Sequence, residues 1–213
     1  MAETSYVLYG TKGSGSAAIE AALVLGQLPH RIVEAATWLP ESKVDELRAV
    51  NPLQQIPTLV VPDGSVMTES AAILVHLGLV LPTGLLLPAE PAQRAQVLRG
   101  LVYIPANCYS AISIMDYPER WTDQGDEASL EAVKSGTRKR LHRHWEIFAD
   151  TFPQRPFLGG QAPGALDLLA SVVSRWGGTR KHLQQHRPEF FELLQRIDTH
   201  PSLAPVFRRH WDS

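Results

Sequence analysis

Two short segments of this sequence place polar or small residues at the start of a predicted helix. Glu69 and Ser70 open an apolar helix that runs to Leu77, and residues 10–17, GTKGSGSA, open another. The first turn of a helix carries unpaired N–H groups and the positive end of the helix dipole. The first segment therefore suits a carboxylate ligand, and a reactive group in the second would meet a helix N-terminus.

A proline stands at the entrance of the strand that precedes the first of these helices. Residues 58–61 form a short, β-branched strand candidate, and an Asp-Gly turn leads into a returning strand at residues 65–67. Pro57 costs no ladder hydrogen bond at this position, and an X-Pro bond is the only kind expected to be cis. A cis bond would leave the Ile56 N–H and C=O free to pair with an extended peptide.

The loop at residues 10–17 also matches a second motif. Gly13, Gly15 and Ala18 satisfy G-x-G-x-x-G/A after a strand, and Glu34 follows Gly15 by 19 residues. That spacing is typical of a dinucleotide-binding fingerprint. A dinucleotide-binding fold needs further parallel strands with helical crossovers, whereas this chain turns to a hairpin and then to helices. An NAD-binding oxidoreductase is therefore the weaker alternative.

Strands and helices alternate only in the first part of the chain. The predicted elements outside the hairpin are strands at residues 5–10 and 30–35, and helices at 16–25, 41–49 and 69–77. From about Pro91 onward the pattern is typical of helices alone, and three prolines interrupt the segment LPTGLLLPAEP that precedes it. We expect an α/β N-terminal domain at residues 1–80, a linker at 81–90 and an all-α domain at 91–213.

Composition excludes several classes of protein. The 20 lysines and arginines nearly balance the 22 aspartates and glutamates, so we expect neither nucleic acid nor a membrane surface as a partner. The most apolar run, residues 71–87, contains His76, Pro82 and two glycines, whereas a membrane-spanning helix needs about 20 apolar residues. MAETSYVLYG has no charged-then-apolar signal pattern, so export is not expected.

Metal chemistry is not expected either. A single cysteine, Cys108, excludes an internal disulfide framework and a tetrahedral cysteine site, and it fits a reducing cytoplasm. We expect it to pack in the core. His142 and His144 lie two apart on a predicted helix and point about 200° apart, so they cannot share a metal. The surrounding KRLHRHW, residues 139–145, is predicted to be a solvated basic face.

The segment NPLQQIPTLVVPDGSVMTESAAILVHL, residues 51–77, resembles cytosolic glutathione S-transferases of the bacterial type, with a serine- or cysteine-loop pattern. YPERW, FLGGQAPGALDLLAS and IDTHPSLAPVF in the second half extend the resemblance over nearly the whole chain. It implies a thioredoxin-like N-terminal domain with a cis-proline, then an all-helical domain that contributes the electrophile pocket. Gly164 departs from the family's usual Ser or Thr three residues before Asp167, which we expect to cap its helix.

The resemblance also implies which side chain holds the glutathione thiolate. In the serine and cysteine classes that residue lies in the loop, about five residues after a strand-end tyrosine, which indicates Ser14. In the tyrosine classes the strand-end tyrosine itself is used, which would be Tyr9. Alignment on the helix brings Ser16 forward. We rank Ser14 first, Tyr9 second and Ser16 third.

Further roles follow from the same resemblance. Ile56 and Pro57 would present the backbone, Glu69 and Ser70 would hold the γ-glutamyl end, and Gln54 would contact the glycyl carboxylate. Candidates for the electrophile pocket, spaced three to four residues apart on a predicted helix, are Tyr103, Asn107 and Ser110.

The implied function is transfer of glutathione, as co-substrate, to a small electrophile, by a cytoplasmic homodimer with a part in detoxification. A non-catalytic module that binds glutathione or another protein is the main alternative, because fold does not fix function. A glutathione-dependent isomerase or peroxidase remains a further alternative.

Overall fold

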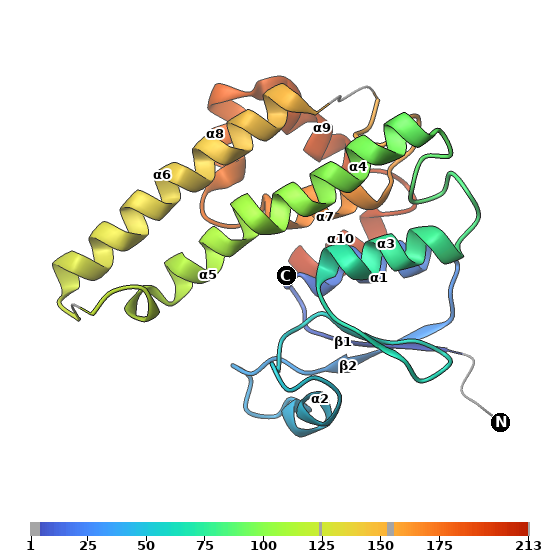
Figure 1. Ribbon diagram of the computed structural model, residues 1–213, viewed down its shortest axis with the longest axis horizontal. Helices are drawn as coiled ribbons and strands as arrows, with labels where there is room; N and C mark the ends of the chain where they lie inside the picture. Colours follow the sequence, from blue (N-terminus) through green and yellow to red (C-terminus); the bar gives the residue numbers. More distant parts are fainter. Residues whose placement is uncertain (1–4, 124, 153–155, 213) are drawn as a thin grey trace.

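The computed structural model describes residues 5–123, 125–152 and 156–212, and it combines a small sheet with a larger helical part (Figure 1). The sheet has four strands in the order β2-β1-β3-β4. β1 pairs in parallel with β2 and antiparallel with β3, which forms a hairpin with β4. The strands are β1 (Tyr6–Gly10), β2 (His30–Glu34), β3 (Thr58–Val60) and β4 (Val66–Met67).

Three helices cover the two faces of this sheet. α1 and α3 lie on one face and α2 on the other (Figure 1). They span α1 (Ser16–Leu25), α2 (Val44–Val50) and α3 (Ser70–Val80). This βαβ, helix, ββα order confirms the thioredoxin-like fold, and only α2 begins noticeably later than predicted.

Alternation along β1 creates two separate cores. Leu8 and its neighbour Leu59 on β3 belong to the large core, which α1 and α3 also enter. Val7 and Tyr9 belong to a small core with Leu47 of α2. Successive side chains of a strand point to opposite faces, so Tyr9 lies on the α2 side of the sheet.

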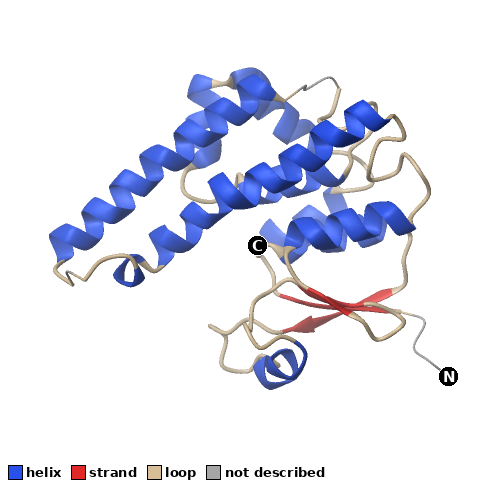
Figure 2. Cartoon of the chain, viewed as in Figure 1, coloured by secondary structure: helices blue, strands red, loops and turns tan. Residues whose placement is uncertain are grey.

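Beyond α3, the regular elements of the described chain are helices joined by loops (Figure 2). α4, a π-helix and α5 follow one another directly and lie beside the long helix α6 (Figure 1). The elements are α4 (Pro91–Tyr103), the π-helix Ile104–Tyr109, α5 (Ser110–Asp116), a 3₁₀ turn Pro118–Arg120, α6 (Glu127–Thr151), α7 (Ala165–Val173), α8 (Thr179–His186), α9 (Pro188–Asp198) and α10 (Ala204–Trp211).

A carboxylate in the first turn of α7, that of Asp167, caps the start of this helix. Asp167 is fully buried and accepts hydrogen bonds from the Leu158 N–H at 2.9 Å and the Gly164 N–H at 3.0 Å. The capping role expected for it is confirmed. Burial raises the pKa of Asp167 to about 6, although these N–H donors act in the opposite direction.

The glycine before α7 has a packing reason. A Cβ added at Gly164 would lie 2.8 Å from the carbonyl oxygen of Leu86. That oxygen accepts a hydrogen bond of 2.9 Å from the Ala165 N–H, which ties α7 to the segment between α3 and α4. That segment, residues 81–90, coincides with the expected linker. The division into domains at this place stays a prediction.

The predicted basic face of α6 is partly wrong. Lys139 and Arg140 are exposed, but His142 bonds to the Gly177 carbonyl at 3.0 Å and His144 to the Asn107 carbonyl at 2.7 Å. Imidazole is both apolar and hydrogen-bonding, so it suits such half-buried contacts between helices. Cys108 is fully buried in the core, as expected. In the described part of the chain, no helix has the length and apolarity needed to cross a membrane.

Candidate functional site

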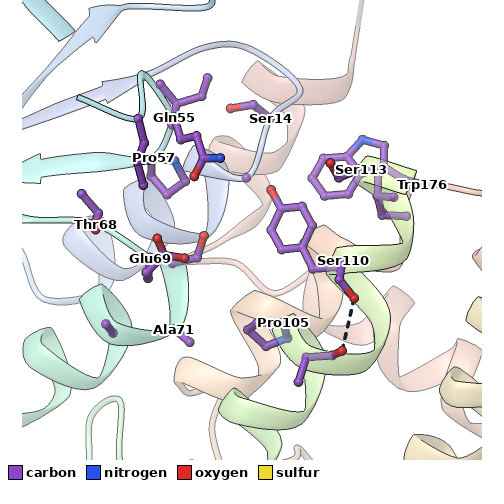
Figure 3. Close-up of a pocket in the computed structure, with 18 of the residues that line it drawn as sticks. Ser14, Gln55, Pro57, Thr68, Glu69, Ala71, Pro105, Ser110, Ser113 and Trp176 are labelled. Carbon is purple, nitrogen blue, oxygen red and sulfur yellow. Dashed lines mark hydrogen bonds between the residues drawn. The ribbon is translucent and has the colours of Figure 1, made fainter. Parts of the chain in front are cut away.

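A groove of about 1780 Å³ runs between the sheet-containing part and the helical part. The N-terminus of α1, the loop before β3 and the N-terminus of α3 form one wall. α4, the π-helix and α5 form the other, with Trp176 from the turn before α8. Figure 3 shows Ser14, Pro57 and Glu69 on the first wall, facing Ser110, Ser113 and Trp176 on the second.

Ser14 sits in a tight turn at the start of α1. Its N–H donates to the Thr11 carbonyl at 3.3 Å, and Gly13 between them has φ +71°. A positive φ at the third residue of a turn favours glycine and is typical of type II. The Ser14 hydroxyl lies 2.8 Å from both the Thr11 carbonyl and the Ser16 hydroxyl, and it lines the groove.

The other two hydroxyls ranked as thiolate partners lie elsewhere. Ser16 does not line the groove; it is 2% exposed and bonds through Oγ to the N–H and the carbonyl of Thr11. It therefore holds the turn together. Tyr9 is buried in the small core beneath the sheet. Of the three, Ser14 alone meets the groove, because the pleat of β1 turns Tyr9 away and the first turn of α1 directs Ser16 inward.

A buried amide that sequence reasoning missed organises the loop before β3. Asn51 is 3% exposed, and its Nδ2 donates to the Gln55 carbonyl at 3.1 Å and to Thr58 Oγ1 at 2.9 Å. Its Oδ1 accepts from the Leu53 N–H at 3.0 Å. The Asn-Pro pair at 51–52, a turn signal, could have identified it.

This loop carries three of the predicted ligand contacts to the groove. The Ile56–Pro57 peptide bond is cis. Gln54 has φ +52°, and its Oε1 accepts from Arg48 at 3.3 Å. Gln54, Ile56 and Pro57 all line the groove.

The N-terminus of α3 has no side-chain cap. Glu69, the N-cap residue, has φ +62° and makes no capping hydrogen bond. Ser70 is 8% exposed, and its hydroxyl has no hydrogen-bond partner among the described residues. Backbone held in a sparsely populated region costs about 1–3 kcal/mol and clusters at ligand sites. Glu69 and Ser70 both line the groove, so the unpaired donors of this helix end open onto it.

Tyr109, at the end of the π-helix, is a groove residue that sequence reasoning missed. Its ring stacks on Trp176 with centroids 5.5 Å apart. A Cβ added at Gly15 would overlap the Tyr109 hydroxyl and would lie 3.6 Å from Pro57 Cδ. The hydroxyl therefore lies against the start of α1. Burial raises the pKa of Tyr109 to about 12, with a contribution from the carboxylates of Asp116 and Glu69, so the phenol stays protonated.

Two of the three residues expected in the electrophile pocket are not in the groove. The Tyr103 hydroxyl donates to the His144 carbonyl of α6 at 3.0 Å, and Asn107 donates to the Tyr103 carbonyl at 3.1 Å. Both residues lie on the α6 side of their helix. Ser110 does line the groove, and its hydroxyl donates to the Ala106 carbonyl at 3.2 Å (Figure 3). The spacing placed the three on one helical face, but the π-helix takes more residues per turn and separates Ser110 from the others.

The 3₁₀ turn and α6 add cationic side chains to the groove lining. Arg120, Lys134 and Arg138 line it there, and Arg120 sits 4.0 Å from the centroid of the Tyr117 ring. The described residues include no group of three or more His, Cys, Asp or Glu side chains that could hold a metal ion. Burial raises the pKa of the Cys108 thiol, which leaves it a poor nucleophile.

Residues 16–79 match the family model of the glutathione S-transferase N-terminal domain. The chain is 29% identical over 205 residues to the GST-like protein YncG of Escherichia coli K12, covering 95% of this chain and 97% of the relative. A glutathione transferase homologue from Sulfitobacter, solved with bound glutathione, has a TM-score of 0.82 at 21% identity, over 95% of this chain and 97% of that one.

A glutathione S-transferase of Methylobacterium radiotolerans, solved in complex with glutathione sulfonate, superposes with a TM-score of 0.75 at 25% identity. The match covers 96% of this chain and 95% of that one. The family model covers the N-terminal segment that bears Ser70 and Pro57, and the similarities to YncG and to the solved structures extend over nearly the whole chain. Residues 16–79 therefore match the N-terminal domain of glutathione S-transferases, and the chain as a whole has the fold of the solved members of that family.

Proposed function

We propose that the protein is a glutathione transferase that conjugates the thiolate of bound glutathione to a small electrophile. The observation that carries this proposal is the convergence on one groove of the Ser14 hydroxyl, the Pro57 loop and the uncapped start of α3. The opposite wall, with Tyr109 and Trp176, supplies a place for the electrophile beside the thiol.

Ser14 is the proposed thiolate partner. A thiol of pKa about 8.5 is about 3% ionised at pH 7, and lowering the pKa to about 6.5 makes it roughly 75% ionised. That change corresponds to about 2.7 kcal/mol. A hydrogen bond to a charged group contributes about 1.5–3 kcal/mol and a helix N-terminus about 0.3–1 kcal/mol, so one hydroxyl at the start of α1 is sufficient.

The Ser14 hydroxyl has to turn to perform this role. In the structure its proton is directed at the Thr11 carbonyl or at Ser16 Oγ. When Ser14 donates to a thiolate, Ser16 can keep its own proton on the Thr11 carbonyl, 3.2 Å away, or donate to Ser14 Oγ. Ser16 thereby supports the bond that Ser14 makes, without touching the ligand.

The remaining contacts follow the groove. The backbone of Ile56 would pair with the peptide part of glutathione, and Gln54 would reach the glycyl carboxylate. The free donors at Ser70 would bind the γ-glutamyl carboxylate, and Glu69 would face its ammonium group. Tyr109, neutral at physiological pH, would donate a hydrogen bond to the thiolate or to the charge that develops on the electrophile.

A non-catalytic glutathione-binding protein is the second candidate. The observation that favours it is the existing engagement of the Ser14 hydroxyl, because an enzyme must break that contact before it stabilises a thiolate. The same groove would then hold glutathione as a thiol.

We also propose a homodimer. Leu79 and Val80 of α3 and Val102 of α4 are 71%, 56% and 68% exposed, and α3 contacts α4. An apolar face of this kind fits a second copy of the chain, and two-fold dimers are the commonest closed assembly. Sedimentation equilibrium would test it: a single 23.5 kDa species at micromolar concentration would contradict the dimer.

The function is tested by titrating the ultraviolet thiolate absorbance of bound glutathione against pH, with affinity measured in the same samples. Wild type should give a pKa well below about 8.5, and Ser14→Ala should return it towards that value. Ser113→Ala, on the opposite wall of the groove, is the matched control and should leave the thiol pKa unchanged.

Three other outcomes of this titration would lead to different conclusions. Normal affinity with an unshifted pKa in wild type would favour the carrier over the transferase. A low pKa that persists in Ser14→Ala would remove Ser14 from the role and direct attention to the hydroxyl of Tyr109. Absence of glutathione binding would overturn both candidates.

A further inference from the structure

The last helix of the chain reaches the turn that carries Ser14. His210 of α10 is 8% exposed, and its Nδ1 lies 3.1 Å from the Gly13 N, although the two residues are 197 positions apart. A Cβ added at Gly13 would lie 3.7 Å from the His210 carbonyl oxygen and 3.9 Å from Trp211 Nε1. The end of α10 therefore packs directly on the residue before Ser14.

The other ring nitrogen of His210 faces a buried carboxylate. His210 Nε2 lies 2.7 Å from Glu20 Oε2, and Arg209 bonds to the second oxygen of Glu20. Glu20 belongs to α1 and is 2% exposed. Burial alone would raise its pKa, but the hydrogen bonds from His210 and Arg209 outweigh burial, and the pKa of Glu20 is lowered below its ordinary value.

These two contacts define the tautomer of His210. An amide N–H can only donate, so Nδ1 must carry a lone pair to accept from Gly13. The proton of the neutral ring then lies on Nε2 and is donated to the Glu20 carboxylate. Glu20 thus fixes the histidine in the form that accepts from the Ser14 turn.

The Gly13 N–H is the group that distinguishes two forms of this turn. Types I and II differ mainly in the orientation of the central peptide, here Lys12–Gly13. Gly13 has φ +71°, whereas Lys12 is not among the residues with positive φ, which corresponds to type II. An acceptor placed at the Gly13 N–H holds that orientation, and with it the path of the backbone into Ser14.

We propose that His210 is a positioning residue for Ser14: the structure assigns it the task of holding the Lys12–Gly13 peptide so that the Ser14 hydroxyl is presented to the groove. The effect on a thiolate rests on the proposed function, whereas the hold on the turn does not. The partner of the turn is therefore a side chain at the far end of the sequence, supported by Glu20 within α1.

Two isosteric variants separate the two contacts of the ring. Asparagine places Oδ1 where Nδ1 of histidine lies, so His210→Asn keeps an acceptor for the Gly13 N–H and loses the contact with Glu20. Glutamine places Nε2 near the position of the histidine Nε2, so His210→Gln keeps the donor to Glu20 and loses the acceptor. Arg209 continues to pair with Glu20 in both variants.

The first readout is hydrogen exchange of the Gly13 amide by NMR, without glutathione. We expect exchange close to wild type in His210→Asn and about fivefold faster exchange in His210→Gln, the loss expected for one hydrogen bond. The second readout is the pKa of bound glutathione, which should rise by about 0.7 in His210→Gln and stay near wild type in His210→Asn. Thermal midpoints of both variants report any general loss of stability.

Equal Gly13 exchange in the two variants would overturn the proposal, because a purely structural histidine would be replaced equally well or badly by either residue. The proposal would also be overturned if the pKa of bound glutathione were unchanged in His210→Gln but shifted in Ser14→Ala. A wild type that binds glutathione without lowering its pKa would overturn the proposed function instead. In that case the Gly13 exchange still decides whether His210 holds the turn.

Discussion

The starts of α3 and α7 differ in what occupies them. At α7 the first turn is filled by the carboxylate of Asp167, which accepts from two backbone N–H groups and is fully buried. At α3 the N-cap residue Glu69 supplies no hydrogen bond and Ser70 faces the groove. The same backbone chemistry thus serves folding where the chain provides its own anion, and it is available for a ligand where the chain does not.

Removing the Asp167 carboxylate should have the largest effect on the free energy of unfolding. Asp167→Ala leaves the N–H groups of Leu158 and Gly164 buried without an acceptor, at about 1–3 kcal/mol each, so we expect a loss of about 4 kcal/mol in the free energy of unfolding. Urea denaturation would measure it. A loss below about 1 kcal/mol would mean that the start of α7 does not depend on its carboxylate, and the contrast with α3 would fail.

The charge of the same group gives a second, somewhat smaller effect. The pKa of Asp167 is raised from 3.8 to about 6. Between these pH values the folded protein binds more protons than the unfolded chain, so stability should fall by about 3 kcal/mol in all as the pH rises from below about 3 to above about 7. Asp167→Asn cannot titrate. The difference in stability between wild type and this variant should therefore change by that amount across the window, and parallel curves would contradict the prediction.

The smallest effect on stability is expected for a substitution at the uncapped start of α3. Ser70→Ala removes a hydroxyl that has no partner among the described residues, so stability should change by less than about 0.5 kcal/mol. The affinity for glutathione should fall about fivefold, the contribution of one hydrogen bond. Calorimetric titration would measure it, with the thiol pKa as a control that should not move. A clear loss of stability without loss of affinity would reverse the roles assigned to α3 and α7.

Local signals were sufficient for the first half of the fold. The β-branched run at residues 58–61, the Asp-Gly turn and the position of Pro57 each predicted a feature that the structure contains. Of the residues proposed there for ligand contact, all except Tyr9 and Ser16 meet in one groove. Chain segments close in sequence form this wall, so their spacing carries most of the information about it.

The second wall could not be predicted in the same way. A spacing of three to four residues identifies a helical face, but not which neighbour that face meets. Tyr103 and Asn107 turned out to face α6, whereas Tyr109 and Trp176, from separate elements, form the groove wall together. The contact of His210 with Gly13 joins the two ends of the chain and leaves no local pattern.

The π-helix Ile104–Tyr109 has a consequence for how this sequence can change by deletion. A π-turn accommodates one more residue than an α-turn, so it behaves as a one-residue insertion stored within a continuous helix. Deleting a single codon there would let the helix relax to ordinary pitch and would rotate every later side chain of α5 around its axis. Tyr109 and Ser110 would leave the groove together while the first wall stayed intact. Chain length at one helical turn, as much as residue type, thus sets which side chains this wall presents to the groove.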